Sequence, residues 1–349
     1  MTLIKVKGRG AENPGRRNLI LNGAMKVAQR GSQNNGTGIS GTACDRFRLA
    51  MSGGAAVTTT QDADVPNLSN GFRNSLKVDC TTADTSVAAG DYVILYQRLE
   101  GQDLQHLLYG TTAHKKITVQ FWVKSPKTGT HYVEIYHLDA SYFSSQQYTI
   151  SAADTWEKKT VTFVGYPTSS FDDDSEGSLQ LDWWLLGGST YSGGTHNSNT
   201  WHNTQANRCP GQVNVLDDTA NNFYLTGVQL EVSDLATDFE HRSYGEELSL
   251  CQRYYNRLGL FYARVRQENV SSQNPDFATT ITFPPMRDAP TINTYTDANY
   301  SSSGTTQTGG SSLGFVNISN SSANASMNSG SSGAQNISNS AYLELDKEI

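Results

Sequence analysis

The sequence predicts a mainly β protein: a jelly-roll β-sandwich, then a linking α-helix, then a smaller C-terminal β domain. Three observations support this prediction. Short segments that alternate apolar and polar residues recur between clusters of Gly, Ser, Asn and Asp from residue 18 to residue 232. A later segment spaces its apolar residues three and four apart, as a helix does. Beyond it, short alternating segments return within a chain rich in Ser, Asn and Gly.

Composition limits the classes of function. The chain has 349 residues, enough for two domains with cores, and 36% of them are hydrophobic. Abundant Gly, Ser, Thr and Asn are typical of β-sandwich and fibre proteins. A formal net charge of −7 gives no electrostatic support for nucleic-acid binding. No stretch approaches the roughly 20 apolar residues of a membrane helix, so we expect no membrane insertion.

The sequence also predicts the compartment in which the protein is made. It has no N-terminal apolar run of signal-peptide length. The four cysteines are widely separated, form no CxxC pair and are expected to be free thiols: Cys44, Cys80, Cys209 and Cys251. We therefore expect synthesis in a reducing cytoplasm without export by a standard signal.

Residues 1–16 are basic and lack an apolar periodicity. They contain Lys5, Lys7, Arg9 and Arg16 together with Gly and Pro. One interpretation is a disordered tail, and the other is an arm that becomes ordered when it docks on a larger assembly.

The first domain, residues 17–242, is predicted to consist of short strands with one helical turn at Gln102–Leu108. The expected strands are Asn18–Met25, Arg46–Met51, Ala56–Gln61, Ser75–Cys80, Tyr92–Leu99, Lys116–Lys124, His131–Leu138, Gln147–Ile150, Lys158–Val164, Ser178–Leu186 and Phe223–Val232. Between the last two, Gly187–Asp218 is a polar segment with isolated Trp201 and Cys209. A loop of that length is unusual in a compact domain, so we expect it to be functional or part of a partner interface.

Residues 243–259 are predicted to form the linking helix. Ser243 and Glu246 have the spacing of a capping box, and Gly259 follows the last periodic residue. The residues expected on its buried face, toward either a threefold axis or the jelly roll, are Leu248, Cys251, Tyr255 and Leu258.

Residues 260–349 are predicted to form a small β domain stabilised by oligomerisation. The expected strands are Leu260–Val265, Ala278–Phe283, Thr291–Tyr295, Leu313–Ile318 and Ala341–Leu345. Composition alone favours disorder for residues 299–340, which have few apolar positions.

Period-two alternation separates the two faces of the strands in the first domain. One face is aliphatic, and the other combines aromatic, amide and charged side chains. Aromatic rings stack on the apolar faces of sugars while the polar groups bond hydroxyls. The candidate glycan-binding residues on this second face are Arg98, Gln120, Trp122, Tyr132, Glu134, Tyr136, Gln180, Asp182 and Trp184.

The favoured alternative for this second face is burial under loops or in a subunit interface, where Tyr, Trp and Arg are also enriched. The sequence does not give the order of the strands, so it does not decide between a platform and a covered face.

Metal and catalytic motifs are weak or absent. The acidic run Asp172–Gly177 carries oxygens that suit calcium, but it lacks EF-hand spacing, and a solvated turn is favoured. His196 and His202 have no third ligand at a suitable spacing for zinc. Glu134 and Asp182 are acids of the kind that pair in glycoside hydrolysis, but no motif sets their separation. We expect no enzyme activity and no cofactor, with calcium as the alternative.

Four segments resemble a known family of jelly rolls, the carbohydrate-binding modules. NLILNG at Asn18–Gly23 is similar to their opening, and KITVQFWVK at Lys116–Lys124 to their central strand. WEKKTVTF at Trp156–Phe163 and FYLTGVQLE at Phe223–Glu231 resemble two later strands. The resemblance covers most of residues 17–232 and implies a sandwich with glycan affinity.

Longer segments resemble fibre or tail structural proteins of tailed bacteriophages, particularly marine, cyanophage-like ones. They are NLILNGAMKVAQRG at Asn18–Gly31, CDRFRLAM at Cys44–Met51, YQRLEG at Tyr96–Gly101, FYLTGVQLEV with DFEHRSYGEELSLCQRYY at residues 223–255, and FPPMRDAPT at Phe283–Thr291. That family usually has Trp where this chain has Phe47.

The phage resemblance implies a virion protein, a homotrimeric tail or capsid fibre without catalytic activity. Residues 1–16 would dock on other virion proteins, and the surface of the protein would meet a host glycan or receptor. Two alternatives remain at this point: a polysaccharide-degrading tailspike, and a capsid decoration or assembly protein without glycan affinity.

Overall fold

The computed structural model describes residues 17–258, 262–266, 276–295, 298–302, 305–307, 313–328, 334–339 and 342–349. The chain divides into two compact units, Met1–Ser243 and Tyr244–Ile349, and this division falls beside the predicted end of the first domain. The predicted docking arm, residues 1–16, lies outside the described residues. Within the described ranges, no helix is long and apolar enough to cross a membrane.

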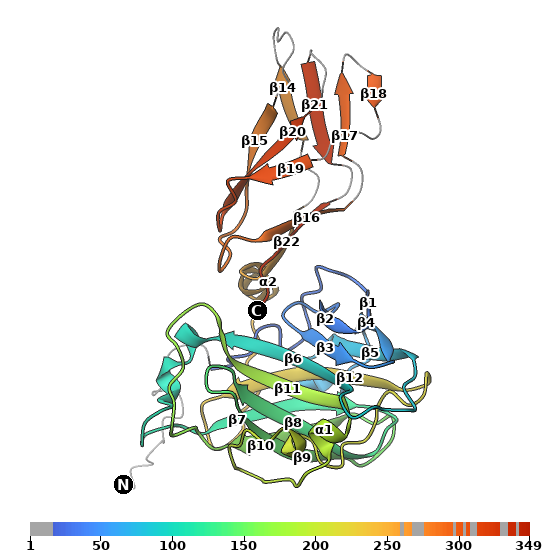
Figure 1. The fold of residues 1–349 in the computed structure, drawn as a ribbon, viewed down its shortest axis with the longest axis vertical. Coiled ribbons are helices and arrows are strands. Elements are labelled where there is room, and N and C mark those ends of the chain that lie inside the picture. The colour runs from blue at the N-terminus through green and yellow to red at the C-terminus, as the bar shows by residue number, and fades with distance from the viewer. Residues whose placement is uncertain are drawn as a thin grey trace, which may run out of the picture. The chain divides into compact units, whose positions relative to one another are not determined.

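The first unit is a sandwich of two six-stranded antiparallel sheets. Sheet A has the order β1 (Gln33–Asn35), β4 (Ala56–Asp62), β5 (Ser75–Thr82), β12 (Asn222–Glu231), β7 (Ile117–Lys124) and β10 (Glu157–Phe163). Sheet B has the order β2 (Gly38–Gly41), β3 (Arg48–Ser52), β6 (Tyr92–Glu100), β11 (Gly177–Gly187), β8 (Gly129–His137) and β9 (Tyr142–Ile150). Figure 1 shows one sheet layered on the other. The predicted mainly β fold is confirmed.

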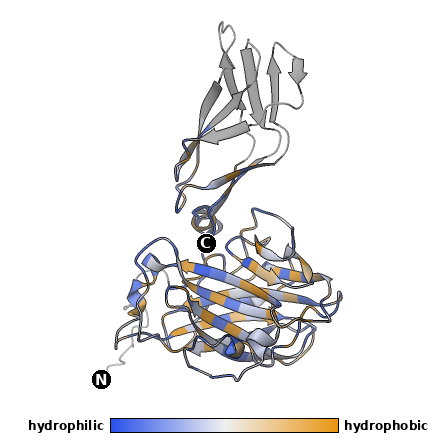
Figure 2. Ribbon diagram, in the orientation of Figure 1, coloured by the Kyte–Doolittle hydropathy of each residue, from blue (hydrophilic) through white to orange (hydrophobic). Residues whose placement is uncertain are grey.

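The core lies between the two sheets. Figure 2 shows hydrophilic and hydrophobic residues alternating along the strands. In β7, Ile117, Val119, Phe121 and Val123 all point into this core, as period two predicts. All four cysteines are buried free thiols, as predicted.

Each predicted strand from Arg46–Met51 to Phe223–Val232 overlaps an observed one, but Asn18–Met25 is not a strand. This segment turns instead, with positive φ angles at Asn22 and Met25. Asn22 Nδ2 donates hydrogen bonds to the carbonyls of Val27 and Asp45. These side-chain hydrogen bonds replace the backbone hydrogen bonds that a β-strand would form with its neighbour. Glycine is required at position 23, where a Cβ atom would lie 2.0 Å from the Val228 carbonyl oxygen. The sequence also missed β1 and β2, which are polar and rich in Asn and Gly.

The segments outside the sheets contain little regular structure. The predicted helical turn at Gln102–Leu108 corresponds to the 3₁₀ turns η2 (Gly101–Asp103) and η3 (Gln105–Leu107), and a third, η1 (Leu68–Asn70), precedes β5. Between β11 and β12, the long polar loop contains one turn of helix, α1 (Ser189–Ser192), and one 3₁₀ turn, η4 (Gln205–Asn207). We call residues 188–216 the cover loop because they lie on sheet B, as described below.

The linking helix is shorter than predicted. Helix α2 (Tyr244–Gln252) begins directly after Ser243, with Glu246 in its first turn, as the capping box predicts. It ends at Gln252, so the expected stop at Gly259 is wrong. Tyr255 and Leu258 lie in strand β13 (Tyr255–Leu258), which pairs with β22 (Tyr342–Asp346). Strand β13 forms because it pairs with β22, which lies far along the chain. The local spacing of apolar residues around β13 therefore does not predict it.

Of the four residues expected on one face of the helix, two belong to α2. Cys251 is buried and Leu248 is half-buried. In β13, Tyr255 is buried, and Leu258 packs against the core of the second unit.

The described residues of the second unit form three small antiparallel sheets. Their orders are β13–β22–β16 (Thr291–Tyr295), β14 (Tyr262–Arg266)–β21 (Ala334–Asn339)–β17 (Ala298–Ser302)–β18 (Thr305–Gln307), and β15 (Asp276–Thr282)–β20 (Ser322–Asn328)–β19 (Leu313–Val316). Much of residues 299–340 therefore forms strands, although composition alone favours disorder. The described core contains Phe283, Met286, Ala323, Leu343 and Leu345.

Candidate functional site

The nine glycan-binding candidates fall on two opposite outer faces of the sandwich, not on one platform. Strands β6, β8 and β11 belong to sheet B, whereas β7 belongs to sheet A. The nine candidates therefore do not form one surface, although each strand presents the residues that its alternation predicts. Sheet B carries Arg98, Tyr132, Glu134, Tyr136, Gln180, Asp182 and Trp184, and sheet A carries Gln120 and Trp122.

On sheet B the candidates meet as cross-strand neighbours. Gln180 lies between Arg98 and Tyr136, and Asp182 lies opposite Glu134. Arg98 Nε donates to Gln180 Oε1 over 2.6 Å, and Gln180 Nε2 donates to Asp182 Oδ1 over 2.7 Å. The register therefore assembles the predicted polar and aromatic cluster.

The cover loop closes this cluster. Trp184, Tyr132, Glu134 and Asp182 are each 0% exposed. Tyr132 Oη donates to the Pro210 carbonyl over 2.6 Å, which holds the loop against β8. The favoured alternative from the sequence, a face buried under loops, is what the structure shows.

Arg208 of the cover loop is the centre of this closed face. Its Nε and Nη2 atoms donate to Glu134 Oε1 over 3.0 and 2.5 Å, and Nη2 lies 3.6 Å from Asp182 Oδ2. Its Cζ atom lies 4.0 Å from the ring centre of Phe143 and 4.8 Å from that of Trp184. Arg208 therefore combines ion pairs with cation–π contacts in a largely buried site.

Asp182, one of the two carboxylates of this face, has a perturbed pKa. Burial raises the pKa of Asp182 well above its ordinary value, the nearby Glu134 raises it further, and Arg208 partly opposes both. Glu134 also accepts a hydrogen bond from Ser145 Oγ over 2.6 Å. Both carboxylates are fully buried and bonded to protein groups, so they are not open to a substrate in this structure.

Sheet A, in contrast, carries an open pocket of about 360 Å³. We call it the Trp122 pocket. It is lined by Ser69, Asn70, Phe72, Gln120, Trp122, Lys158, Gly227, Asp238, Phe239 and His241. Trp122 is half-buried, and Lys158 and His241 are exposed. The pocket combines a tryptophan face with amide, hydroxyl, ammonium and carboxylate groups.

Aromatic rings pack along one side of the pocket. The ring centres of Phe72 and Phe239 lie 5.0 Å apart, those of Phe239 and His241 4.8 Å apart, and those of Phe72 and His241 5.4 Å apart. Burial lowers the pKa of His241, and Lys26 lowers it further, so the imidazole is neutral at pH 7. This side of the pocket is therefore an uncharged aromatic surface.

Gly227 allows the rings to approach each other. It has a φ of +62°, and a Cβ atom there would lie 2.7 Å from Phe72 Cζ and 3.0 Å from Trp122 Cδ1. It also lies at an irregularity in the pairing of β12 with β7, between Thr226 and Gln229. A glycine inside a strand pattern was the sequence signal that could have identified this side of the pocket.

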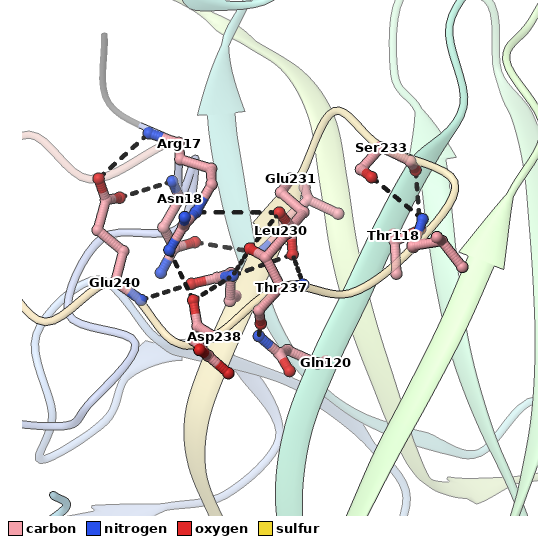
Figure 3. A network of polar contacts seen from close by, with 12 residues as sticks. Arg17, Asn18, Thr118, Gln120, Leu230, Glu231, Ser233, Thr237, Asp238 and Glu240 are labelled. Atoms are coloured by element: carbon pink, nitrogen blue, oxygen red, sulfur yellow. Dashed lines mark hydrogen bonds and ion pairs between the residues drawn. The ribbon is translucent and has the colours of Figure 1, made fainter. Parts of the chain in front are cut away.

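Residues 233–242, which we call the strap, contribute Asp238, Phe239 and His241 to the pocket wall and are fixed by a polar network (Figure 3). Glu231 accepts hydrogen bonds from the backbone N–H and hydroxyl of Thr237 over 2.8 and 2.7 Å. Gln120 Nε2 donates to the Thr237 carbonyl over 2.5 Å, and Gln229 Oε1 accepts from Glu240 N over 2.7 Å. The wall is thus held to β7 and β12 by hydrogen bonds on both strands.

The N-terminal end of the sandwich also holds the strap. Glu240 accepts from the backbone N–H groups of Arg17 and Asn18 over 3.3 and 2.7 Å, and Arg17 Nη2 donates to the Asp238 carbonyl over 2.6 Å (Figure 3). Burial alone would raise the pKa of Glu240, but the two N–H groups and nearby Arg242 hold it below its ordinary value. The pocket wall is therefore preformed, which lowers the entropy lost on binding.

The outer face of sheet A continues beside the pocket with charged and aromatic side chains. Lys124 forms an ion pair with Asp64 and lies 4.2 Å from the ring centre of Tyr224. Trp156 Nε1 donates to Asp64 Oδ1 over 2.9 Å. A half-buried tryptophan thus extends the aromatic surface beyond the pocket.

The metal-site candidates are not assembled. Across the described residues, no group of three or more His, Cys, Asp and Glu side chains could hold a metal ion. The acidic run at Asp172–Gly177 and the pair His196 and His202 therefore form no such cluster here.

The comparisons with known proteins give structural similarities at low identity. No protein-family model matches the chain, and no curated protein matches its sequence. The tailspike protein 4 enzymatically active domain of bacteriophage CBA120 is 14% identical, with a TM-score of 0.31, over 62% of this chain. The chain covers 21% of the length of that tailspike structure.

Carbohydrate-binding modules are also among the similar structures. A family 11 module of Clostridium thermocellum, solved with a β-1,3-1,4-mixed-linked tetrasaccharide, is 12% identical, with a TM-score of 0.29, over 58% of this chain and 100% of the module. A family 11 module of a cellulosomal cellulase from the same organism is 13% identical, with a TM-score of 0.28, over 60% of this chain and 100% of the module.

Proposed function

We propose that this chain is a structural protein of a bacteriophage virion, a tail or capsid fibre, that binds a host-surface glycan without cleaving it. The observation that carries the glycan-binding part is the Trp122 pocket: a half-buried tryptophan in an open, preformed pocket of about 360 Å³. The phage part rests on the sequence segments that resemble phage fibre and tail proteins.

The chemistry of the pocket suits a sugar. The Trp122 ring offers an apolar face for the C–H groups of a pyranose, and Phe72, Phe239 and His241 provide further apolar surface. Ser69, Asn70 and Asp238 provide directed hydrogen-bonding groups for hydroxyls. Because the strap and strands already hold these groups in place, little ordering is needed on binding.

The closed face of sheet B supports the part of this proposal that excludes catalysis. Glu134 and Asp182 are the acids that the sequence offers for glycoside hydrolysis, and Arg208 occupies the space beside both. A homotrimeric fibre would present three Trp122 pockets, so that weak individual contacts act together through effective concentration.

Glycan-array binding of the purified full chain tests the pocket. We expect Trp122→Ala to lower glycan affinity at least about tenfold, because it removes the stacking face. Tyr136→Ala, which removes a half-buried aromatic ring from the closed face of sheet B, is the matched control and should bind as the wild type does. The reverse pattern, with binding lost in Tyr136→Ala and kept in Trp122→Ala, would overturn the assignment of the pocket.

Two further measurements test the rest of the proposal. If the protein releases oligosaccharide from a bound glycan, and Glu134→Gln abolishes this release, the proposal of a non-cleaving fibre is wrong. The protein would then be a polysaccharide-degrading tailspike. Immunogold electron microscopy of virions should label the tail or capsid, and unlabelled virions would exclude a structural role. Labelled capsids with no glycan binding would indicate a decoration or assembly protein.

A further inference from the structure

The Trp122 pocket contains a cation whose position relative to the tryptophan is fixed by strand pairing. Lys158 of β10 is the direct cross-strand partner of Trp122 of β7. Both line the pocket, and Lys158 is exposed to solvent. Side chains of directly paired residues lie side by side on the same face of a sheet. A ring stacked on Trp122 would therefore place one of its edges beside the Lys158 ammonium group.

The charge of Lys158 is not neutralised by the protein, unlike that of its neighbours. Lys124 forms an ion pair with Asp64, Lys77 with Asp79 over 2.9 Å, and Lys159 with Glu157 over 2.5 Å. Among the described residues, the Lys158 ammonium group makes no ion pair or hydrogen bond, although the Lys158 backbone pairs with that of Trp122. A ligand anion would thus gain the interaction with Lys158 without first breaking an internal ion pair.

The pocket is also lined by a carboxylate. Asp238 belongs to the strap, and its backbone carbonyl accepts a hydrogen bond from Arg17. Asp238 and Lys158 do not form an ion pair with each other. The pocket therefore places a cation beside the tryptophan and a hydrogen-bond acceptor for hydroxyl groups on the strap.

We infer that the Trp122 pocket selects an anionic sugar residue, with the anion bound by Lys158 and hydroxyls bound by Asp238. This inference rests on the proposed glycan-binding function and specifies its ligand class. A hexuronate has both required groups, because its carboxylate and its hydroxyls lie on one pyranose ring. An ammonium group is a point charge without a preferred acceptor geometry, so a sulfate ester is the other source of the same chemistry.

Isothermal titration of the full chain at low salt with matched polymers tests the inference. The ligands are polygalacturonate, its methyl-esterified form, dextran sulfate and dextran. We expect the wild type to bind at least one charged polymer about tenfold more tightly than its neutral counterpart, and to lose this preference as salt is added. The comparison of polygalacturonate with dextran sulfate distinguishes a carboxylate from a sulfate ligand.

Three lysine variants isolate the role of the ammonium group. Lys158→Gln should remove the preference for the charged polymer and leave affinity for the neutral polymer unchanged, and Lys158→Arg should retain the preference. Lys116→Gln, which changes an exposed lysine outside the pocket, is the control and should bind as the wild type does. Equal losses in Lys116→Gln and Lys158→Gln, or equal wild-type binding of charged and neutral polymers, would overturn the inference.

Failure of the inference is distinguishable from failure of the proposed function. If Trp122→Ala abolishes binding to every polymer while Lys158→Gln changes none, the pocket binds glycans without selecting anions, and the inference is wrong. If Trp122→Ala changes no binding at all, the pocket is not the glycan site, and both proposals fail.

Discussion

The two outer faces of the sandwich have similar chemistry and opposite accessibility. Each carries a tryptophan, a glutamine and a basic residue at alternate positions of neighbouring strands. On sheet B, Trp184 is 0% exposed beneath the cover loop. On sheet A, Trp122 is half-buried in an open pocket. An aromatic and polar strand face therefore does not identify a binding surface until the segments that cover it are known.

The covering segments explain the difference. The cover loop brings Arg208 over the acidic centre of sheet B, where Glu134 and Asp182 provide the opposite charge. The strap lies along part of sheet A, and its polar contacts are made with Gln120, Gln229 and Glu231. Trp122 lies beside the strap at the edge of the covered region. The polar residues of sheet B thus bind the cover loop. Those of sheet A hold the strap beside the accessible Trp122 ring.

The largest effect is expected from removing the cation of the closed face. Arg208→Ala would leave Glu134 and Asp182 buried without their counter-charge, and we expect the free energy of unfolding to fall by about 3–5 kcal/mol. Urea denaturation followed by circular dichroism measures the change. The triple variant Arg208→Met, Glu134→Gln and Asp182→Asn removes all three charges and should recover much of the loss. A loss below about 1 kcal/mol for Arg208→Ala would show that the face is not closed in solution.

The two tryptophans provide a direct comparison of the faces. Trp184→Ala should lower the free energy of unfolding by about 3–5 kcal/mol, because it opens a cavity beneath the cover loop. Trp122→Ala should lower it by about 1 kcal/mol, because the ring is already partly in water. The same denaturation experiment measures both variants. Similar losses would mean that both faces are covered, and the assignment of an open pocket to sheet A would be wrong.

The smallest expected effect is on the pH dependence of stability. The pKa of Asp182 is raised in the folded protein, so the native state holds its proton to higher pH than the unfolded state does. The associated stability is complete below the unfolded pKa of about 3.9 and is lost as pH rises through the folded pKa. Asp182→Asn should keep the bond from Gln180 and remove this loss. The melting temperature of the wild type should therefore fall relative to that of Asp182→Asn as pH rises above about 4.

A control separates the pH dependence caused by Asp182 from the pH dependence caused by other acidic residues. Glu240 of the strap has a lowered pKa, so its stability contribution has the opposite sign and is lost as pH falls. Glu240 is present in both the wild type and Asp182→Asn, so its contribution cancels in the difference between their melting temperatures. A constant difference across pH would contradict the raised pKa of Asp182.

The fold class and strand faces could be predicted because both follow from local patterns. Side chains alternate along any strand, so Val119 and Phe121 share one face of β7 whichever strands pair with it, and that face lies in the core. Local patterns do not predict two kinds of structure found in this chain. The turn at Asn22 and Met25 depends on side-chain bonds to the backbone, and β13 depends on pairing with β22 far along the chain.

The sequence alone determined that the protein is mainly β, that its first domain is a sandwich, and which residues share a strand face. These features depend on residues within a few positions of each other. Only the tertiary structure decided that β7 lies in the sheet opposite β8 and β11, that Arg208 closes one face, and that Phe72, Phe239 and Gly227 meet at Trp122. Those arrangements depend on strand order and loop placement, which contacts between residues distant in the chain establish.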